Sequence, residues 1–226
     1  MIDLFNNGCG DIHSLVAKMS YPEIIGNCPI EEVKYKFKHW RSEAKGVEFA
    51  INYGGDANTI HGNKGIPLVE ANKIYNNYMK GFKGMKVYQD RQRKFVMEHG
   101  YIITDFSSGR KAYIYDYDIL MGIKARFNQE YWATYKLYKG KENKLLPKQV
   151  KNELYQRFAR GDNFNSMVGV YHYTTKKAGK DTIREAYVNI ADVYVHPVRH
   201  FFKRKSASEK QAINYPCQGC GATMFK

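Results

Sequence analysis

The chain is poor in cysteine and proline and contains no long apolar run. It has four Cys and six Pro among 226 residues. A membrane-spanning helix needs about 20 consecutive apolar residues, and no stretch approaches that length. The first ten residues, MIDLFNNGCG, show neither the basic start nor the apolar core of a signal peptide. We therefore expect a cytoplasmic protein without a disulfide framework.

Acidic residues are also scarce relative to basic ones. The chain holds 36 Lys plus Arg against 22 Asp plus Glu, which gives a formal charge of +14, and 19 Tyr are scattered among the cations. Cations suit a phosphate backbone, and rings suit stacking on bases or sugars. A generally basic soluble protein of ribosomal type is the alternative that charge alone leaves open. With 43% hydrophobic residues the chain is expected to fold.

The few cysteines offer little support for a metal site. Cys217 and Cys220 form a C-x-x-C pair, which would be half of a zinc site, but no second pair of Cys or His stands at ligand spacing. Cys9 and Cys28 are interpreted as ordinary small residues. We predict no metal ligands on this chain.

The hydrophobic pattern predicts an α+β fold that is mainly helical. A helix capped by Asp11 should carry Ile12, Leu15, Val16 and Met19 on one face. The residues around a Ser-Ser-Gly turn at 107–109 change to the alternating pattern of a β-hairpin. A Ser followed three residues later by Glu predicts a capping box at Ser206 or its neighbour. The expected helices are 10–21, 31–53, 66–82, 83–100 and 206–226, the hairpin is 100–116, and 117–205 mixes both signals.

One helical stripe has a distinctive composition. Arg41, Lys45, Phe49 and Tyr53 follow one another at four-residue intervals and end at Gly54. Residues four apart lie above one another on a helix, so two cations could meet a polyanion while two rings meet a sugar or base. The alternative is that both rings are core residues and both cations form a solvated face.

Further segments make this stripe part of a larger pattern. The stripe resembles the fingers-helix motif, motif B, of family A DNA polymerases, the group of bacterial DNA polymerase I and many phage enzymes. GDIHSLVA before it, GYIITDFSSGRK after it and INYPCQGCGATMFK near the end resemble the family's neighbouring segments in the same order. The resemblance implies a fingers-like region at 1–116, an insertion at 117–205 and the start of a palm helix at 206–226.

The resemblance implies roles for individual residues. Arg41 and Lys45 would bind the triphosphate of the incoming dNTP, and Lys45 would protonate the leaving pyrophosphate as general acid. Phe49 would pack on the sugar, Tyr53 would lie near the templating base, and His13 would hydrogen-bond the triphosphate. Four residues would contact primer-template DNA: Arg110, Lys210, Asn214 and Gln218.

The chain departs from the family in its carboxylates. Family members hold two metal ions mainly by two Asp residues, from a strand motif and a His-Asp-Glu hairpin, and neither motif occurs in these 226 residues. We therefore expect a fragment or subunit, inactive alone, whose Mg²⁺ ligands come from remaining polymerase pieces that carry both motifs. A non-catalytic nucleic-acid-binding remnant is the alternative. RNA polymerisation is disfavoured because single-subunit RNA enzymes carry a different helix motif.

The insertion at 117–205 has its own composition. The runs KLYKGKENKLLPK and HPVRHFFKRK are basic with interleaved aromatic residues. This pattern is typical of an accessory contact with duplex DNA or with another polymerase piece. A solvated surface elaboration is the equally weighted alternative.

Overall fold

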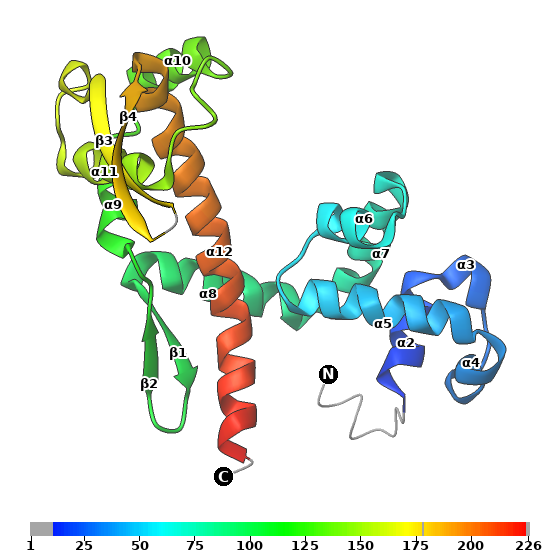
Figure 1. The fold of residues 1–226 in the computed structure, drawn as a ribbon. Helices are drawn as coiled ribbons and strands as arrows, with labels where there is room; N and C mark the ends of the chain where they lie inside the picture. Colours follow the sequence, from blue (N-terminus) through cyan, green and yellow to red (C-terminus); the bar gives the residue numbers. More distant parts are fainter. Residues whose placement is uncertain (1–10, 178, 225–226) are drawn as a thin grey trace. The chain divides into compact units, whose positions relative to one another are not determined.

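The computed structural model describes residues 11–177 and 179–224. The chain divides into two compact units (Figure 1). Unit 1 comprises the residues up to 113 together with those from 208 onward, and unit 2 comprises residues 114–207. The described part is mainly helical and contains two small antiparallel sheets, β1-β2 and β3-β4, which confirms the α+β prediction. The assignment of fingers, insertion and palm to these regions stays a prediction.

Unit 1 consists mostly of short helices. Asp11 caps the first of them, and its side chain accepts a hydrogen bond from the Ser14 backbone N–H at 3.3 Å, as its position before an apolar stripe predicts. The elements are α2 (Ile12–Ser20), α3 (Pro22–Ile25), α4 (Ile30–Lys36), α5 (Lys38–Asn52), α6 (Ala57–Lys64), α7 (Leu68–Gly81), α8 (Lys83–His99), β1 (Tyr101–Asp105) and β2 (Arg110–Tyr113).

The core of unit 1 is largely aliphatic. Helix α2 packs against both α5 and α7. Val16 is fully buried, while Ile12, Leu15 and Met19 are partly buried against the same core, so the predicted face of α2 is confirmed. Cys28 also packs there. The fully buried core residues of unit 1 include Val16, Ala17, Val33, Ala44, Val47, Ile51, Ile60, Ala71 and Tyr78.

The predicted β-hairpin is present between residues 101 and 113. Tyr101 pairs with Tyr113 and Ile102 with Ala112. Gly109 adopts φ +66° in the connecting turn, a conformation that favours glycine. The buried Asp105 carboxylate accepts hydrogen bonds from the Ser107 and Ser108 hydroxyls, each at 2.7 Å. These bonds hold the turn together.

Unit 2 has an aromatic core. Arg126 lies against two of its rings, with its guanidinium carbon 4.5 Å from the Phe158 centroid and 4.3 Å from the Phe164 centroid. The elements are α9 (Tyr117–Ala125), α10 (Gln129–Tyr138), α11 (Lys148–Arg160), η1 (Asn165–Met167), β3 (Gly169–Lys177), β4 (Lys180–Val188) and the start of α12 (Ile190–Met224).

The predicted capping box at Ser206 is wrong. Ser206 lies inside α12, which begins at Ile190. The observed box is at Asn189: its side chain accepts from the Asp192 N–H at 2.9 Å, and the Asp192 carboxylate accepts from the Asn189 N–H at 2.9 Å. The sequence contains both spacings, Asn189-Asp192 and Ser206-Glu209, and the helix begins at the first of them.

Membrane insertion has no support among the described residues. None of their helices combines the length and the apolarity that crossing a bilayer requires.

Candidate nucleotide and DNA site

Helix α5 presents the predicted stripe at its surface. Its buried face consists of Ala44, Val47, Glu48 and Ile51. On the other side Lys45 is exposed, Phe49 is 47% exposed and Tyr53, the C-terminal cap, is 48% exposed. The alternative in which both rings are core residues therefore does not describe this structure.

The two rings form a continuous aromatic surface. Phe49 and Tyr53 stack with centroids 6.4 Å apart and planes inclined by 23°. The Lys45 ammonium lies 5.8 Å from the Phe49 centroid, within reach of a cation–π interaction. The centroid of the His13 ring lies 6.4 Å from that of Phe49. The structure thus brings one cation, two rings and one imidazole together on adjacent surfaces of α2 and α5.

Arg41 is bound by a carboxylate of its own chain. Its Nε and Nη2 donate to the Asp11 carboxylate at 2.9 Å and 3.0 Å, which is a bidentate geometry. The hydrogen bond from Arg41, assisted by Ser14, holds the pKa of Asp11 well below its ordinary value, although partial burial acts in the opposite direction. An anion at Arg41 would therefore compete with Asp11.

His13 is engaged in a similar way. Its Nδ1 lies 2.7 Å from Oε2 of Glu48, which is buried on the inner face of α5. This contact fixes the imidazole ring at the junction of α2 and α5. Nε2, the other ring nitrogen, takes no part in this contact.

A pocket of about 380 Å³ lies beside the two rings. Its volume is at the lower end of those seen for small-molecule sites. Lys210, predicted to contact DNA, lines this pocket together with the two rings of the stripe. The lining residues are Gly46, Phe49, Ala50, Tyr53, Gly55, Thr59, Asn63 and Lys210.

Two glycines shape the end of α5. Gly54 has φ +76°, and a Cβ added there would lie 2.8 Å from Cδ1 of Ile213. A Cβ at Gly55 would lie 2.6 Å from the Ala50 carbonyl oxygen, which accepts the Gly55 N–H at 2.8 Å. Both positions therefore require glycine, which explains why the stripe stops at Gly54-Gly55.

The sequence reasoning missed the residues that anchor this end of α5. Gln89 of α8 is 1% exposed, and its Nε2 donates to the Ile51 carbonyl at 2.8 Å. The Tyr78 hydroxyl of α7 donates to Oδ1 of Asn52 at 2.9 Å. Both contacts satisfy groups in the last turn of α5, immediately before Tyr53. A glutamine on an amphipathic helix is expected to face solvent. Only its position relative to the apolar face of α8 could have indicated that Gln89 is buried.

The predicted DNA-binding residues are not all in one place. Arg110 and Gln218 line a second pocket of about 410 Å³ with Thr104, Lys111, Ala112 and Tyr215. The Arg110 Nε donates to the Thr104 hydroxyl at 3.2 Å. Asn214 is half-buried on α12 and is not among the residues lining either pocket. Lys210 belongs to the ring pocket, as described above.

The described carboxylates offer no cage for Mg²⁺. Among residues 11–177 and 179–224, no three Asp, Glu, His or Cys side chains come together in a way that could hold a metal. Asp11 binds Arg41, Asp105 binds two serines, and Asp116 binds Arg204 at 3.0 Å. The described residues therefore do not fit the family's metal ions. Cys9 lies outside the described residues, and the side chains of Cys217 and Cys220 are also outside them.

Comparison with known proteins assigns the family. The family model "DNA polymerase family A" matches residues 1–134, which is more than half of the chain. The chain therefore belongs to DNA polymerase family A.

Two curated relatives agree with this assignment. A DNA polymerase I of Caldicellulosiruptor bescii is 34% identical over 116 residues, which cover 51% of this chain and 12% of the relative. A DNA polymerase of Mycobacterium phage D29 is 29% identical over 104 residues, which cover 46% of this chain and 16% of the relative. The matched region thus spans less than a fifth of either relative.

Proposed function

We propose that this chain is the part of a DNA-directed DNA polymerase that binds the incoming dNTP and primer-template DNA. The observation that carries the proposal is the row formed by Lys45, Phe49 and Tyr53, which is exposed beside a pocket of about 380 Å³. Family membership supplies the class of reaction, a nucleotidyl transfer.

In this proposal each group on α5 has one task. Lys45 binds the triphosphate and delivers a proton to the leaving pyrophosphate, because an ammonium beside the bridging oxygen stabilises the charge that develops there. Phe49 packs against the sugar, and Tyr53 continues that surface toward the base. Arg41 and His13 bind phosphate oxygens in place of Asp11 and Glu48.

DNA contacts complete the proposed site. Lys210 lies next to the rings, and Arg110 and Gln218 line a separate pocket. A guanidinium suits a backbone phosphate, and an amide suits the base-edge acceptors that all base pairs share in the minor groove. Asn214 is proposed to act with Gln218, one helical turn away on α12.

The metal-binding carboxylates are proposed to come from polypeptide outside these 226 residues. Two bound Mg²⁺ ions would supply the charge neutralisation that phosphoryl transfer requires. The residues of this chain would bind and orient the nucleotide and would donate the proton. Alone, the chain is therefore expected to bind dNTP and DNA without extending a primer.

The first test is nucleotide binding by the chain itself. We expect Lys45→Ala to weaken dNTP binding at least tenfold, about 1.4 kcal/mol, in a fluorescence or calorimetric titration. Lys94→Ala is the matched control, since Lys94 lies 3.8 Å from Glu98 on the exposed surface of α8. Equal dNTP affinity for Lys45→Ala and the parent chain would refute the nucleotide-binding role.

The second test is primer extension. The chain is produced together with a polypeptide that carries the two Asp motifs, and magnesium-dependent extension is measured with and without Lys45→Ala. Extension that depends on Lys45 supports the proposed enzyme part.

A non-catalytic nucleic-acid-binding remnant is the second candidate, favoured by the charge of +14. It predicts steeply salt-dependent DNA binding that is indifferent to Lys45→Ala, and no extension in any mixture.

A further inference from the structure

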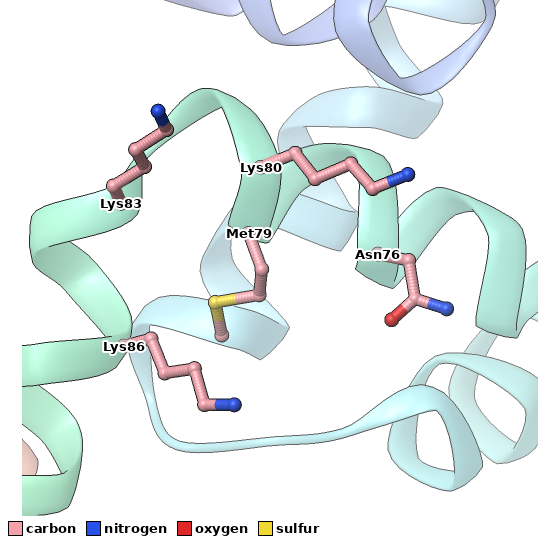
Figure 2. A pocket seen from close by; sticks show the side chains of 5 residues that line it. All are labelled: Asn76, Met79, Lys80, Lys83 and Lys86. Carbon is pink, nitrogen blue, oxygen red and sulfur yellow. The ribbon is translucent and has the colours of Figure 1, made fainter.

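Three lysines surround one pocket at the joint between α7 and α8. The pocket has a volume of about 430 Å³ and is lined by Asn76, Met79, Lys80, Lys83 and Lys86. Figure 2 shows Asn76 and Lys80 on α7, Lys83 and Lys86 on α8, and the Met79 side chain between them. We refer to Lys80, Lys83 and Lys86 as the lysine cluster. None of these five residues lines the ring pocket beside Phe49 and Tyr53.

The charge of the lysine cluster is not compensated locally. All three side chains are exposed, and none forms a hydrogen bond or ion pair with a described residue. None of the residues described as lining the pocket is acidic. Elsewhere in unit 1, by contrast, Lys36, Lys73 and Lys94 each face a carboxylate, those of Glu32, Glu23 and Glu98.

The backbone at the pocket adds to the positive potential. Helix α8 begins at Lys83, has no side-chain hydrogen bond at its N-terminal cap and carries no acidic residue in its first turn. Free N–H groups and the helix dipole make such an end attractive to anions. The lysines are the primary observation, and the helix end reinforces them.

The arrangement fits an extended polyanion better than a single phosphate. The lysine side chains spread around Met79 instead of converging on one point (Figure 2). Cations placed side by side along a surface match successive phosphates of a nucleic-acid strand. The pocket also suits one flexible strand better than a broad, convex duplex, and Met79, the apolar side chain among its lining residues, can contact a sugar.

We propose that the lysine cluster, with Asn76, binds the sugar–phosphate backbone of single-stranded DNA. This inference rests on the proposed DNA binding and deepens it, because it adds a DNA contact that involves no residue of the α5 stripe. The cluster would be a second DNA-binding surface, at the α7-α8 joint. Its ligand would be an unpaired template strand.

The test is the salt dependence of DNA binding by the full chain. Each phosphate contact with a single strand contributes about 0.7 to the slope of log binding constant against log salt. The triple variant Lys80→Gln, Lys83→Gln, Lys86→Gln should lower this slope by about 2 for a fluorescent oligothymidylate measured between about 50 and 200 mM salt.

A matched triple variant controls for net charge. Lys36→Gln, Lys73→Gln, Lys94→Gln removes the same charge from unit 1, but at lysines that face carboxylates. It should change the slope by much less than the cluster variant. An equal decrease in both variants would show a general charge effect and overturn the proposal, as would an unchanged slope in the cluster variant.

Two further ligands sharpen the assignment. The cluster substitutions should lower the salt-dependence slope less for binding of a blunt DNA duplex than for binding of the oligothymidylate. An equal or larger decrease for the duplex would overturn the single-strand assignment. Inorganic pyrophosphate should not displace the oligothymidylate from the cluster at equal phosphate concentration, and efficient displacement would show a simple anion site instead.

The outcome is independent of the α5 site. A chain in which Lys45→Ala leaves dNTP binding intact would refute the proposed nucleotide site while leaving the lysine-cluster result unchanged. Far-UV circular dichroism should be the same for all variants, because the substituted side chains are exposed.

Discussion

The two units use aromatic residues in opposite ways. In unit 1 the core is mainly aliphatic, and the rings of Phe49 and Tyr53 are about half exposed. In unit 2 the rings pack against one another inside: Tyr131 and Phe158, both nearly fully buried, have centroids 5.5 Å apart. Rings beside cations therefore lie on an exposed surface in one unit and in the core in the other. Composition alone does not distinguish these cases.

Arginine shows the same difference. Arg41 of unit 1 is half-buried and is held by the Asp11 carboxylate. Arg126 of unit 2, also half-buried, lies on Phe158 and Phe164, donates to the Phe158 carbonyl at 2.9 Å, and its pKa is lowered by burial. The first arginine is held by a charged partner, whereas the second is held by aromatic rings and a backbone carbonyl.

The largest expected effect comes from the core of unit 2. Phe158→Ala removes a fully buried ring and should destabilise unit 2 by about 3–5 kcal/mol. The chain has two tryptophans, Trp40 in unit 1 and Trp132 in unit 2. Variants with Trp40→Phe or Trp132→Phe therefore report urea unfolding of one unit at a time. If Phe158→Ala lowered the stability of unit 1, reported by Trp40 fluorescence, by a comparable amount, the division into two units would be contradicted.

The next effect compares two glutamines that both bind backbone. Gln89→Leu removes one of two donors to the Ile51 carbonyl, which keeps its hydrogen bond from the Gly54 N–H at 2.9 Å, and should cost unit 1 about 0.5–1.5 kcal/mol. It should also weaken dNTP binding, because the end of α5 carries Tyr53. Gln149 of unit 2 bonds to the backbone of Thr174, but its side chain is exposed. Gln149→Leu should therefore cost well under 1 kcal/mol in the same unfolding measurement.

A smaller effect concerns the competition at Arg41. Asp11→Asn removes the charge that binds Arg41 but keeps an effective helix cap, since Asn and Asp cap similarly. We expect dNTP affinity to increase several-fold, about 1 kcal/mol. Asp116→Asn, which removes a carboxylate from Arg204 of unit 2, should leave dNTP affinity unchanged. A decrease in affinity for Asp11→Asn would mean that Asp11 orients Arg41 and does not compete with the nucleotide.

The smallest expected effect is a pH dependence in unit 2. Burial lowers the pKa of His200 below its ordinary value near 6.5, the Asp116 carboxylate opposes this shift, and Arg204 adds to it. Below pH 6.5 the unfolded state binds a proton that the folded state does not, so the stability of unit 2 should fall as the pH decreases. His200→Gln should flatten this dependence, and His172→Gln, which removes an exposed imidazole, should leave it in place.

The local features of unit 1 were predictable because each follows from short-range chemistry. The Asp11 cap, the turn at Gly109 and the positive φ of Gly54 at the end of α5 are local backbone features. The pairing of Arg41 with Asp11 and the burial of Gln89 depend on which helices meet. No periodicity in one segment contains that information.

Burial within residues 117–205, the expected insertion, likewise depends on which elements meet. In the run HPVRHFFKRK, His196 and Phe201 are buried, at 4% and 5% exposed, while Phe202 is 49% exposed. In KLYKGKENKLLPK, Glu142 is buried and bound to Arg199. Part of each run therefore belongs to the core of unit 2, and its proposed contact with DNA rests on fewer side chains than the composition indicates.

The carboxylates that hold Arg41 and His13 have a consequence for ligand choice. In the proposed site, a nucleotide that binds Arg41 and His13 would replace two resident carboxylates, those of Asp11 and Glu48. A ligand with one phosphate would offer too few oxygens to replace both carboxylates, whereas a triphosphate would offer enough to bind Arg41, His13 and Lys45 together. The site would then select nucleotides by their number of phosphate groups, independently of the base, and would bind nucleoside monophosphates poorly.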